Sequence, residues 1–264
     1  MFCILDIKDR KRRFFHKNPP YFAEKIVIPK KAVFEKLTVF SYSGKCDFYA
    51  VKEHLKAFSK SVILAENCVL PDSSGLFEFS SNELKARMIF NSAVKLMENV
   101  GNRRNITFTL ADKTGDFSSL AEEVIPYAGR VNVITDNPVR YRYTADEIFD
   151  NYGAVVSVGE WSNAVPDTDV FVSLSSMGFS PLAVSVKNRK NNGFITLEGD
   201  SFTLPDGILK YKPSNVKNYP FASALYSLSS VKTLGKMNYR SFTVNSRQIT
   251  LNSAAKMLDT LLNI

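Results

Sequence analysis

The amino-acid sequence predicts an α/β protein, because segments with strand and helix character alternate along the middle of the chain. Residues 105–158 read in turn as a strand (NITFTLAD), a helix (LAEEVIPYA), a strand (RVNVITD), a helix (YTADEIFDNYG) and a strand (AVVSV). Repeated β-α-β units place parallel strands in one sheet and helices on its faces. We therefore expect strands 106–111 and 131–136 to run parallel within a single sheet.

The composition is that of an ordinary globular protein. Of the 264 residues, 45% are hydrophobic and 23% are charged, and a chain of this length buries a sizeable core without disulfides or metals. No apolar run approaches the roughly 20 residues that span a bilayer, and the N-terminus becomes charged too early for a secretory signal. We expect a cytoplasmic protein with no membrane partner. The three cysteines, Cys3, Cys46 and Cys68, form no CxxC pair, which favours a reducing compartment.

The first third of the chain predicts a second, smaller α/β region. Strands are expected at residues 25–29, 36–41 and 61–65, and a helix at 48–58, where Val51 and Leu55 have helical spacing. A long helix then covers residues 80–101 and stops at Gly101. Because a new β-α-β series begins just after this stop, we predict two domains. They are an N-terminal α/β domain at residues 1–101 and a larger domain at residues 102–264.

The remainder of the chain predicts a mixture of strands and loops with a final helix. Residues 170–174 and 194–197 are expected to be strands, whereas residues 182–186 fit either a strand or the start of a helix. The segments 138–143 (PVRYRY) and 187–193 are interpreted as loops. Residues 204–220 are expected to be irregular because proline and glycine punctuate them, and residues 253–264 form a terminal amphipathic helix.

The net charge of +8 is concentrated at the N-terminus. Nine of the first 31 residues are lysine or arginine against three acids, and Phe14, Phe15 and Tyr21 lie among them. Bases interleaved with aromatic rings suit a single-stranded nucleic acid. The alternative is an N-terminal strand or hairpin whose aromatic rings pack on the protein while its bases stay solvated. The sequence leaves both open.

The central segment, residues 105–174, resembles Rossmann-like nucleotide-binding domains, including the two-domain arrangement of shikimate dehydrogenase and related enzymes. In such domains the turn after the first strand faces a phosphate, and here this turn reads ADKTGDFSS over residues 111–119. The resemblance implies that Lys113, Thr114, Gly115 and Ser118 line a cofactor. Asp136 ends the next strand 21 positions after Gly115, where these families place the carboxylate that holds a ribose hydroxyl.

The same turn departs from the family pattern in two ways. It has one glycine instead of three, and Asp116 would repel a phosphate. The structural alternative is a turn in which Asp116 or Ser118 caps the next helix. Further along, Ser175 and Gly178 follow the strand at residues 170–174. The carboxyl end of such a strand is where open α/β sheets bind ligands, so both are predicted to line a pocket.

Catalytic patterns are scarce in this chain. The two histidines are His16, in the basic segment, and His54, within the predicted helix 48–58, and no spacing of His and Cys matches a metal site. The arginines of PVRYRY, Arg140 and Arg142, follow the second strand, where an NADP enzyme could hold its 2′-phosphate. Asp167 and Asp169 precede a strand and are interpreted as the end of a turn. We assign no catalytic residue from the sequence.

Three functions follow from these patterns, and the first is favoured. It is a non-catalytic binding or regulatory module that kept the fold and lost the cofactor turn. The alternative is an NAD(P)-dependent oxidoreductase or another nucleotide-binding enzyme that takes a small-molecule or nucleotide ligand. The third is nucleic-acid binding through residues 1–31. No metal is predicted, and NAD(P) is the cofactor that the alternative implies.

Overall fold

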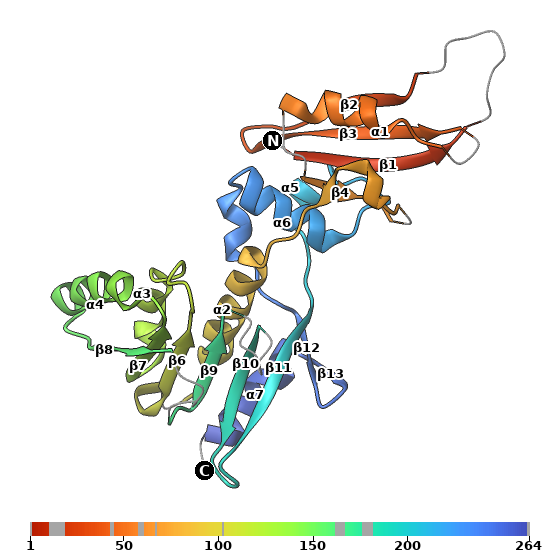
Figure 1. Cartoon of the computed structure of the whole chain (residues 1–264). Coiled ribbons are helices and arrows are strands. Elements are labelled where there is room, and N and C mark those ends of the chain that lie inside the picture. Colours follow the sequence, from red (N-terminus) through yellow and green to blue (C-terminus); the bar gives the residue numbers. More distant parts are fainter. Residues whose placement is uncertain are drawn as a thin grey trace. The chain divides into compact units, whose positions relative to one another are not determined.

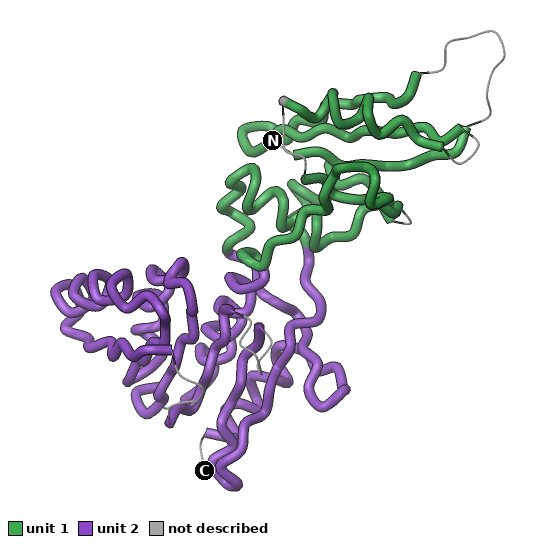
Figure 2. Tube along the Cα trace, viewed as in Figure 1, with its two compact units in different colours: residues 1–84, 204–235 green, residues 85–203, 236–264 purple. Residues whose placement is uncertain are grey.

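The chain forms two compact units, each built around its own β-sheet (Figures 1 and 2). The computed structural model describes residues 2–10, 19–42, 45–57, 61–66, 68–101, 103–161, 167–175 and 182–262. Unit 1 comprises residues 1–84 and 204–235, and unit 2 comprises residues 85–203 and 236–264. This division differs from the predicted domains 1–101 and 102–264. Residues 85–101 group with unit 2, and residues 204–235 group with unit 1.

The sheet of unit 1 has five strands in the order β2-β3-β1-β4-β5. The pairs β1–β3, β1–β4 and β4–β5 are parallel, and β2 pairs antiparallel with β3. The predicted β-α-β unit is therefore present, with β3 and β4 parallel on either side of β1. The strands are β1 (Phe2–Asp9), β2 (Tyr21–Ile28), β3 (Ala32–Ser41), β4 (Ser61–Leu64) and β5 (Phe77–Glu78).

Apolar side chains cover both faces of this sheet. On one face, Leu5, Leu37 and Val62 pack with Val51 of helix α1 (Phe48–His54). On the other face, Phe221 of helix α6 (Asn218–Leu228) lies edge-on to the ring of Phe34, with centroids 5.4 Å apart. Burial on both faces explains why the central strand β1 reads as the continuous apolar run FCIL.

The sheet of unit 2 has eight strands in the order β13-β12-β11-β10-β9-β6-β7-β8. The four neighbours β9, β6, β7 and β8 are parallel, so the central prediction of parallel strands at 106–111 and 131–136 is confirmed. The strands β9 to β13 pair antiparallel. The parallel strands are β6 (Thr107–Ala111), β7 (Arg130–Thr135), β8 (Val156–Glu160) and β9 (Val170–Ser173). The others are β10 (Ala183–Asn188), β11 (Gly193–Ser201), β12 (Ser241–Val244) and β13 (Arg247–Thr250).

Helices connect and cover the strands of unit 2. Helix α3 (Leu120–Val124) joins β6 to β7, and helix α4 (Pro138–Tyr152) joins β7 to β8 (Figure 1). Helix α2 (Glu83–Met97) packs on the sheet through Phe90, whose ring lies 6.4 Å from that of Phe108. The terminal helix α7 (Leu251–Leu262) contacts β10, β12 and β13. Together these elements confirm the α/β class.

Several sequence-based assignments are corrected by the structure. The segment PVRYRY is the first part of α4 and not a loop, because Pro138 starts the helix and Tyr141 is fully buried. Residues 204–220 are not irregular throughout, since helix α5 (Asp206–Leu209) lies within them and α6 begins at Asn218. Ser118 does not cap α3: Ser119 occupies the N-cap position, and its side chain makes no capping hydrogen bond. The hairpin β12–β13 was not predicted at all.

Candidate functional site

The candidate site lies at the carboxyl ends of β6, β7 and β9. The parallel strands follow the spatial order β8-β7-β6-β9, so the direction in which successive strands are added reverses between β6 and β9. In open α/β sheets this reversal leaves a crevice at the carboxyl edge, where ligands bind. Here backbone bonds bring the two strand ends together, since the Leu174 N–H donates to the Ala111 carbonyl at 2.9 Å.

Asp112 stands at the end of β6 and is fully buried. Its carboxylate accepts a hydrogen bond of 2.8 Å from the backbone N–H of Phe117 and one of 2.9 Å from the hydroxyl of Tyr141. Burial raises the pKa of Tyr141 well above its ordinary value, and the neighbouring charge of Asp112 adds to this. The tyrosine therefore remains a hydrogen-bond donor to Asp112 at every physiological pH. A carboxylate of the protein thus takes a backbone amide of the turn that would otherwise be available to a phosphate.

The single glycine of the turn is covered by the side chain of Arg140 in α4 and by that of Asn137, the residue just before α4. Gly115 has a φ of +76°, and a Cβ atom built on it would lie 3.3 Å from Arg140 Cδ and 3.3 Å from Asn137 Cβ. Arg140 also pairs with Asp116 at 2.5 Å. Hydrogen bonds from Thr114 and then from Arg140 lower the pKa of Asp116 below its usual value. The ion pair therefore connects the turn to α4 at the surface of the protein.

Most of the residues predicted to line a cofactor do lie together. The backbone N–H of Lys113 donates to Ser175 Oγ at 3.1 Å, and Lys113 Nζ lies 3.9 Å from Asp136 Oδ2. The carbonyl of Thr114 accepts a hydrogen bond of 3.4 Å from the Asn137 side chain. Ser118 lies in the turn before α3, where its carbonyl accepts the Ala121 N–H at 3.1 Å. Gly178 lies outside the described residues.

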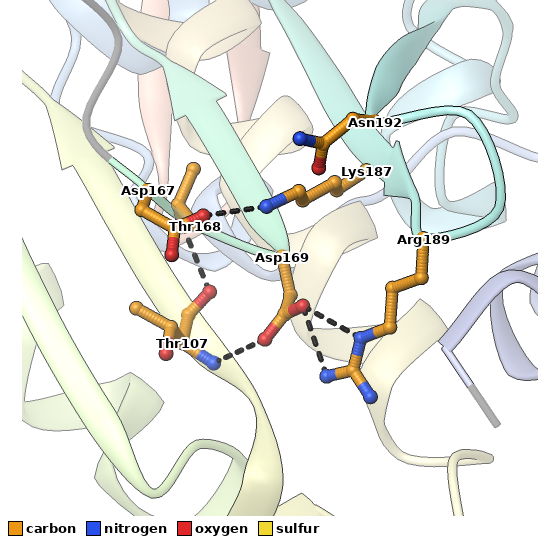
Figure 3. A pocket seen from close by; sticks show the side chains of 7 residues that line it. All are labelled: Thr107, Asp167, Thr168, Asp169, Lys187, Arg189 and Asn192. Atoms are coloured by element: carbon orange, nitrogen blue, oxygen red, sulfur yellow. Dashed lines mark hydrogen bonds and ion pairs between the residues drawn. The ribbon is translucent and has the colours of Figure 1, made fainter. Parts of the chain in front are cut away.

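A second group of polar residues lies at the opposite, amino edge of the same strands (Figure 3). Asp169 is nearly buried, and one of its oxygens accepts the Thr107 N–H at 2.9 Å. The other accepts two hydrogen bonds from Arg189, from Nε at 3.0 Å and from Nη2 at 2.9 Å. Lys187 pairs with Asp167 at 2.5 Å. The sequence analysis interprets Asp167 and Asp169 as turn residues and does not predict their partners, Lys187 and Arg189.

This second group is a structural junction. It surrounds a cavity of about 360 Å³, but Arg189 is turned toward the protein, where it also donates to the carbonyl oxygens of Leu262 at 2.7 Å and Asn105 at 3.4 Å. The guanidinium thereby links β9, the end of β10, the end of α7 and the residues before β6. The fork geometry of arginine suits such a junction because it satisfies several acceptors at once.

The described part of the basic N-terminal segment has both packed and exposed aromatic rings, since Tyr21 is partly buried and the Phe22 side chain is 60% exposed. Tyr21 packs against the core of unit 1, and its hydroxyl lies 3.2 Å from His54 Nδ1. The other ring nitrogen of His54 lies 2.9 Å from Glu35 Oε2. The Arg10 guanidinium lies over the Phe40 ring at 4.7 Å from its centroid. The contacts of Tyr21 agree with the alternative of packed aromatic rings, whereas the exposed Phe22 does not. Phe14, Phe15 and His16 lie outside the described residues.

The described ranges show neither a metal-binding cluster nor a membrane-spanning helix. Within them, no group of His, Cys, Asp or Glu side chains is arranged to hold a metal ion. Among the helices that the structure describes, none has the length and apolar character required to cross a lipid bilayer. Cys3, Cys46 and Cys68 are free thiols, and burial raises the pKa of Cys3 to about 12.

The comparisons with known proteins give no family and a distant structural similarity. No protein-family model matches the chain, and no curated protein matches it. Among solved structures, the chain is similar to L-tryptophan dehydrogenase from Nostoc punctiforme, with 11% sequence identity and a TM-score of 0.28. The match covers 53% of this chain and 44% of that one, so the chain spans less than half the length of that protein.

Proposed function

We propose that the protein is a non-catalytic binding module, in which a Rossmann-like domain has kept its strand order and closed its phosphate-binding turn. The order β8-β7-β6-β9 corresponds to strands 3-2-1-4 of a doubly wound sheet, which supports the Rossmann-like assignment. The observation that carries the proposal is the position of Asp112. Its buried carboxylate accepts the hydrogen bond of the Phe117 N–H. A phosphate placed there would therefore lack this donor and would be repelled by the negative charge of Asp112.

Two further contacts support the same conclusion. The Arg140–Asp116 pair lies over the turn, and the side chains of Arg140 and Asn137 fill the space beside Gly115 through which a pyrophosphate would approach the backbone. The hydroxyl of Ser175 takes the Lys113 amide. The predicted lining residues are thus bonded to one another.

The second candidate function is a nucleotide-binding enzyme, and the position of Lys113 favours it. The ammonium group is half-exposed at the carboxyl edge and lies 3.9 Å from Asp136, in the arrangement of a cation beside a ribose-binding carboxylate. Binding to this edge would require the Arg140–Asp116 pair to open.

Thermal unfolding with NAD, NADP and ATP separates the two candidates. A ligand that binds the native state alone stabilises it by RT ln(1 + [L]/Kd). We expect no rise in Tm with any of the three at millimolar concentration. A rise that disappears in the Lys113→Ala variant and persists in a Lys190→Ala control would overturn the proposal and establish the second candidate. Lys190 lies in the exposed turn between β10 and β11, away from the carboxyl edge.

A further inference from the structure

Helix α4 exposes a continuous row of large side chains on the side that faces away from the sheet. Among the described residues, five large apolar side chains within residues 139–155 are exposed. Three of them belong to α4, namely Val139, Tyr143 and Phe149, and they are 57%, 73% and 58% exposed. The inward side of the helix carries the buried Tyr141 and Ile148. Exposed apolar side chains that gather in one place mark interaction surfaces.

These residues share one face with four charged residues. At about 100° per residue, the positions 139, 142, 143, 146, 147, 149 and 150 fall on the half of the helix opposite Tyr141 and Ile148. We call this set the outer face of α4. Its members are Val139, Arg142, Tyr143, Asp146, Glu147, Phe149 and Asp150.

The charges of the outer face are arranged against the dipole of their own helix. Acids stabilise the first turn of a helix and bases stabilise the last, yet Arg142 lies in the first half and Asp146, Glu147 and Asp150 lie in the second. Within the described residues none of these four side chains forms an ion pair. Asp150 lies in the last turn, where its negative charge opposes the helix dipole, and the described residues supply it with no cation.

A second copy of the same helix, packed antiparallel, supplies the missing partners. In that arrangement the basic half of each helix lies against the acidic half of the other, and the two helix dipoles also oppose each other favourably. Val139, Tyr143 and Phe149 then lie between the helices. The face is therefore complementary to itself in both charge and apolar character.

We propose that the outer face of α4 is the surface through which two copies of this chain associate, with their α4 helices antiparallel. A 15-residue helix is about 22 Å long, so a helix pair provides an interface at the small end of the range for specific complexes. Val155, exposed just before the edge strand β8, extends the apolar surface beyond the helix. We expect dissociation in the micromolar range.

Charge reversal on the outer face tests this proposal without depending on the register of the two helices. Arg142→Asp makes the charges of the face uniformly acidic. The combined changes Asp146→Arg, Glu147→Arg and Asp150→Arg make them uniformly basic. Sedimentation velocity of the full-length chain should show a concentration-dependent dimer for the unmodified protein. Each variant alone should dimerise at least about 10-fold more weakly, because like charges then meet.

The decisive measurement mixes the two variants. An acidic and a basic outer face should form a 1:1 heterodimer, and the variant with all four charges reversed should dimerise with itself again. Lys190→Asp, an exposed charge reversal in the β10–β11 turn, is the matched control and should leave the dimer unchanged. Circular dichroism checks that each variant is folded. An unmodified chain that stays monomeric up to about 200 µM, well above the expected micromolar Kd, overturns the proposal. So does a mixture that fails to form the heterodimer.

Discussion

Tyr141 and Asp112 join helix α4 to the end of strand β6 through a buried hydrogen bond of 2.9 Å. The two residues are 29 positions apart and belong to successive β-α units. Because the same Asp112 oxygen accepts the Phe117 N–H, this bond couples the position of α4 to the conformation of the turn at residues 112–119. The turn that we propose to be closed is therefore linked, through Asp112, to the helix that we propose to mediate association.

Removing the hydroxyl of Tyr141 should destabilise the protein while leaving its fold intact. In Tyr141→Phe, the fully buried carboxylate of Asp112 loses one of its donors, and a hydrogen bond to a charged group contributes about 1.5–3 kcal/mol to the free energy of unfolding. Urea denaturation followed by circular dichroism measures this change. Tyr143→Phe is the control, because the Tyr143 side chain is 73% exposed. Equal stability of the two variants would contradict a role for the Tyr141–Asp112 bond.

The strands of the central region could be predicted from sequence, whereas the contacts of the candidate site could not. Local patterns predict the strand at residues 106–111 and the helix before β8. The helix begins at Pro138, several residues earlier than the sequence analysis places it. The partner of Asp112 lies on the next helix and becomes visible only when both elements dock. The Asp169–Arg189 pair likewise depends on the register of β9 with β10, in which Val170 faces Val186.

The hairpin β12–β13 had a local signal that was overlooked. Asn245 and Ser246 both have positive φ, at 48° and 63°, which is the conformation of a two-residue hairpin turn. Asparagine is one of the few non-glycine residues that adopt it readily. The alternating segments SFTV and RQIT on either side then form the strands. Each strand has only four residues, which is too short for a periodic pattern to identify it from the sequence.

Removing Arg189 should cost much more stability than removing the neighbouring Lys187. In Arg189→Ala, the nearly buried Asp169 keeps the Thr107 amide but loses two charge-assisted hydrogen bonds. Breaking a buried pair from one side costs about 3–5 kcal/mol, and we expect about 2–3 kcal/mol here because Arg189 is one-third exposed. Lys187→Ala should change the free energy of unfolding by less than about 1 kcal/mol, since its partner Asp167 is largely exposed. Chemical denaturation of both variants measures the two losses. Equal losses would contradict the role of Arg189 as a structural junction.

The stability of the protein should fall at alkaline pH, because the buried thiol of Cys3 holds its proton more tightly in the folded chain than in the unfolded chain. Burial raises the pKa of Cys3 from 9.0 to about 12, so above pH 9 the unfolded chain releases a proton that the folded chain retains. The contribution of Cys3 is complete below pH 9 and declines as the pH rises toward 12. Tyr141 acts in the same direction, because its pKa is also raised by burial. Replacing Cys3 by alanine should flatten the dependence of Tm on pH between 9 and about 11, although the overall stability drops from the lost packing. A slope unchanged by the substitution would contradict the assignment to Cys3.

Comparing two glycines should reveal how tightly Arg140 and Asn137 close the turn. Gly115 and Gly153 have similar positive φ values, 76° and 64°, so alanine at either position bears the same backbone strain of about 1–2 kcal/mol. A Cβ on Gly153 meets nothing within 4 Å, whereas a Cβ on Gly115 presses on Arg140 and Asn137 at 3.3 Å. Gly115→Ala should therefore lose more stability than Gly153→Ala in urea denaturation. In an Arg140→Ala background one of the two crowding side chains is gone, and the difference between the glycine variants should shrink. If the difference stays the same, the space beside Gly115 is limited by Asn137 and not by the α4 side chain proposed to cover it.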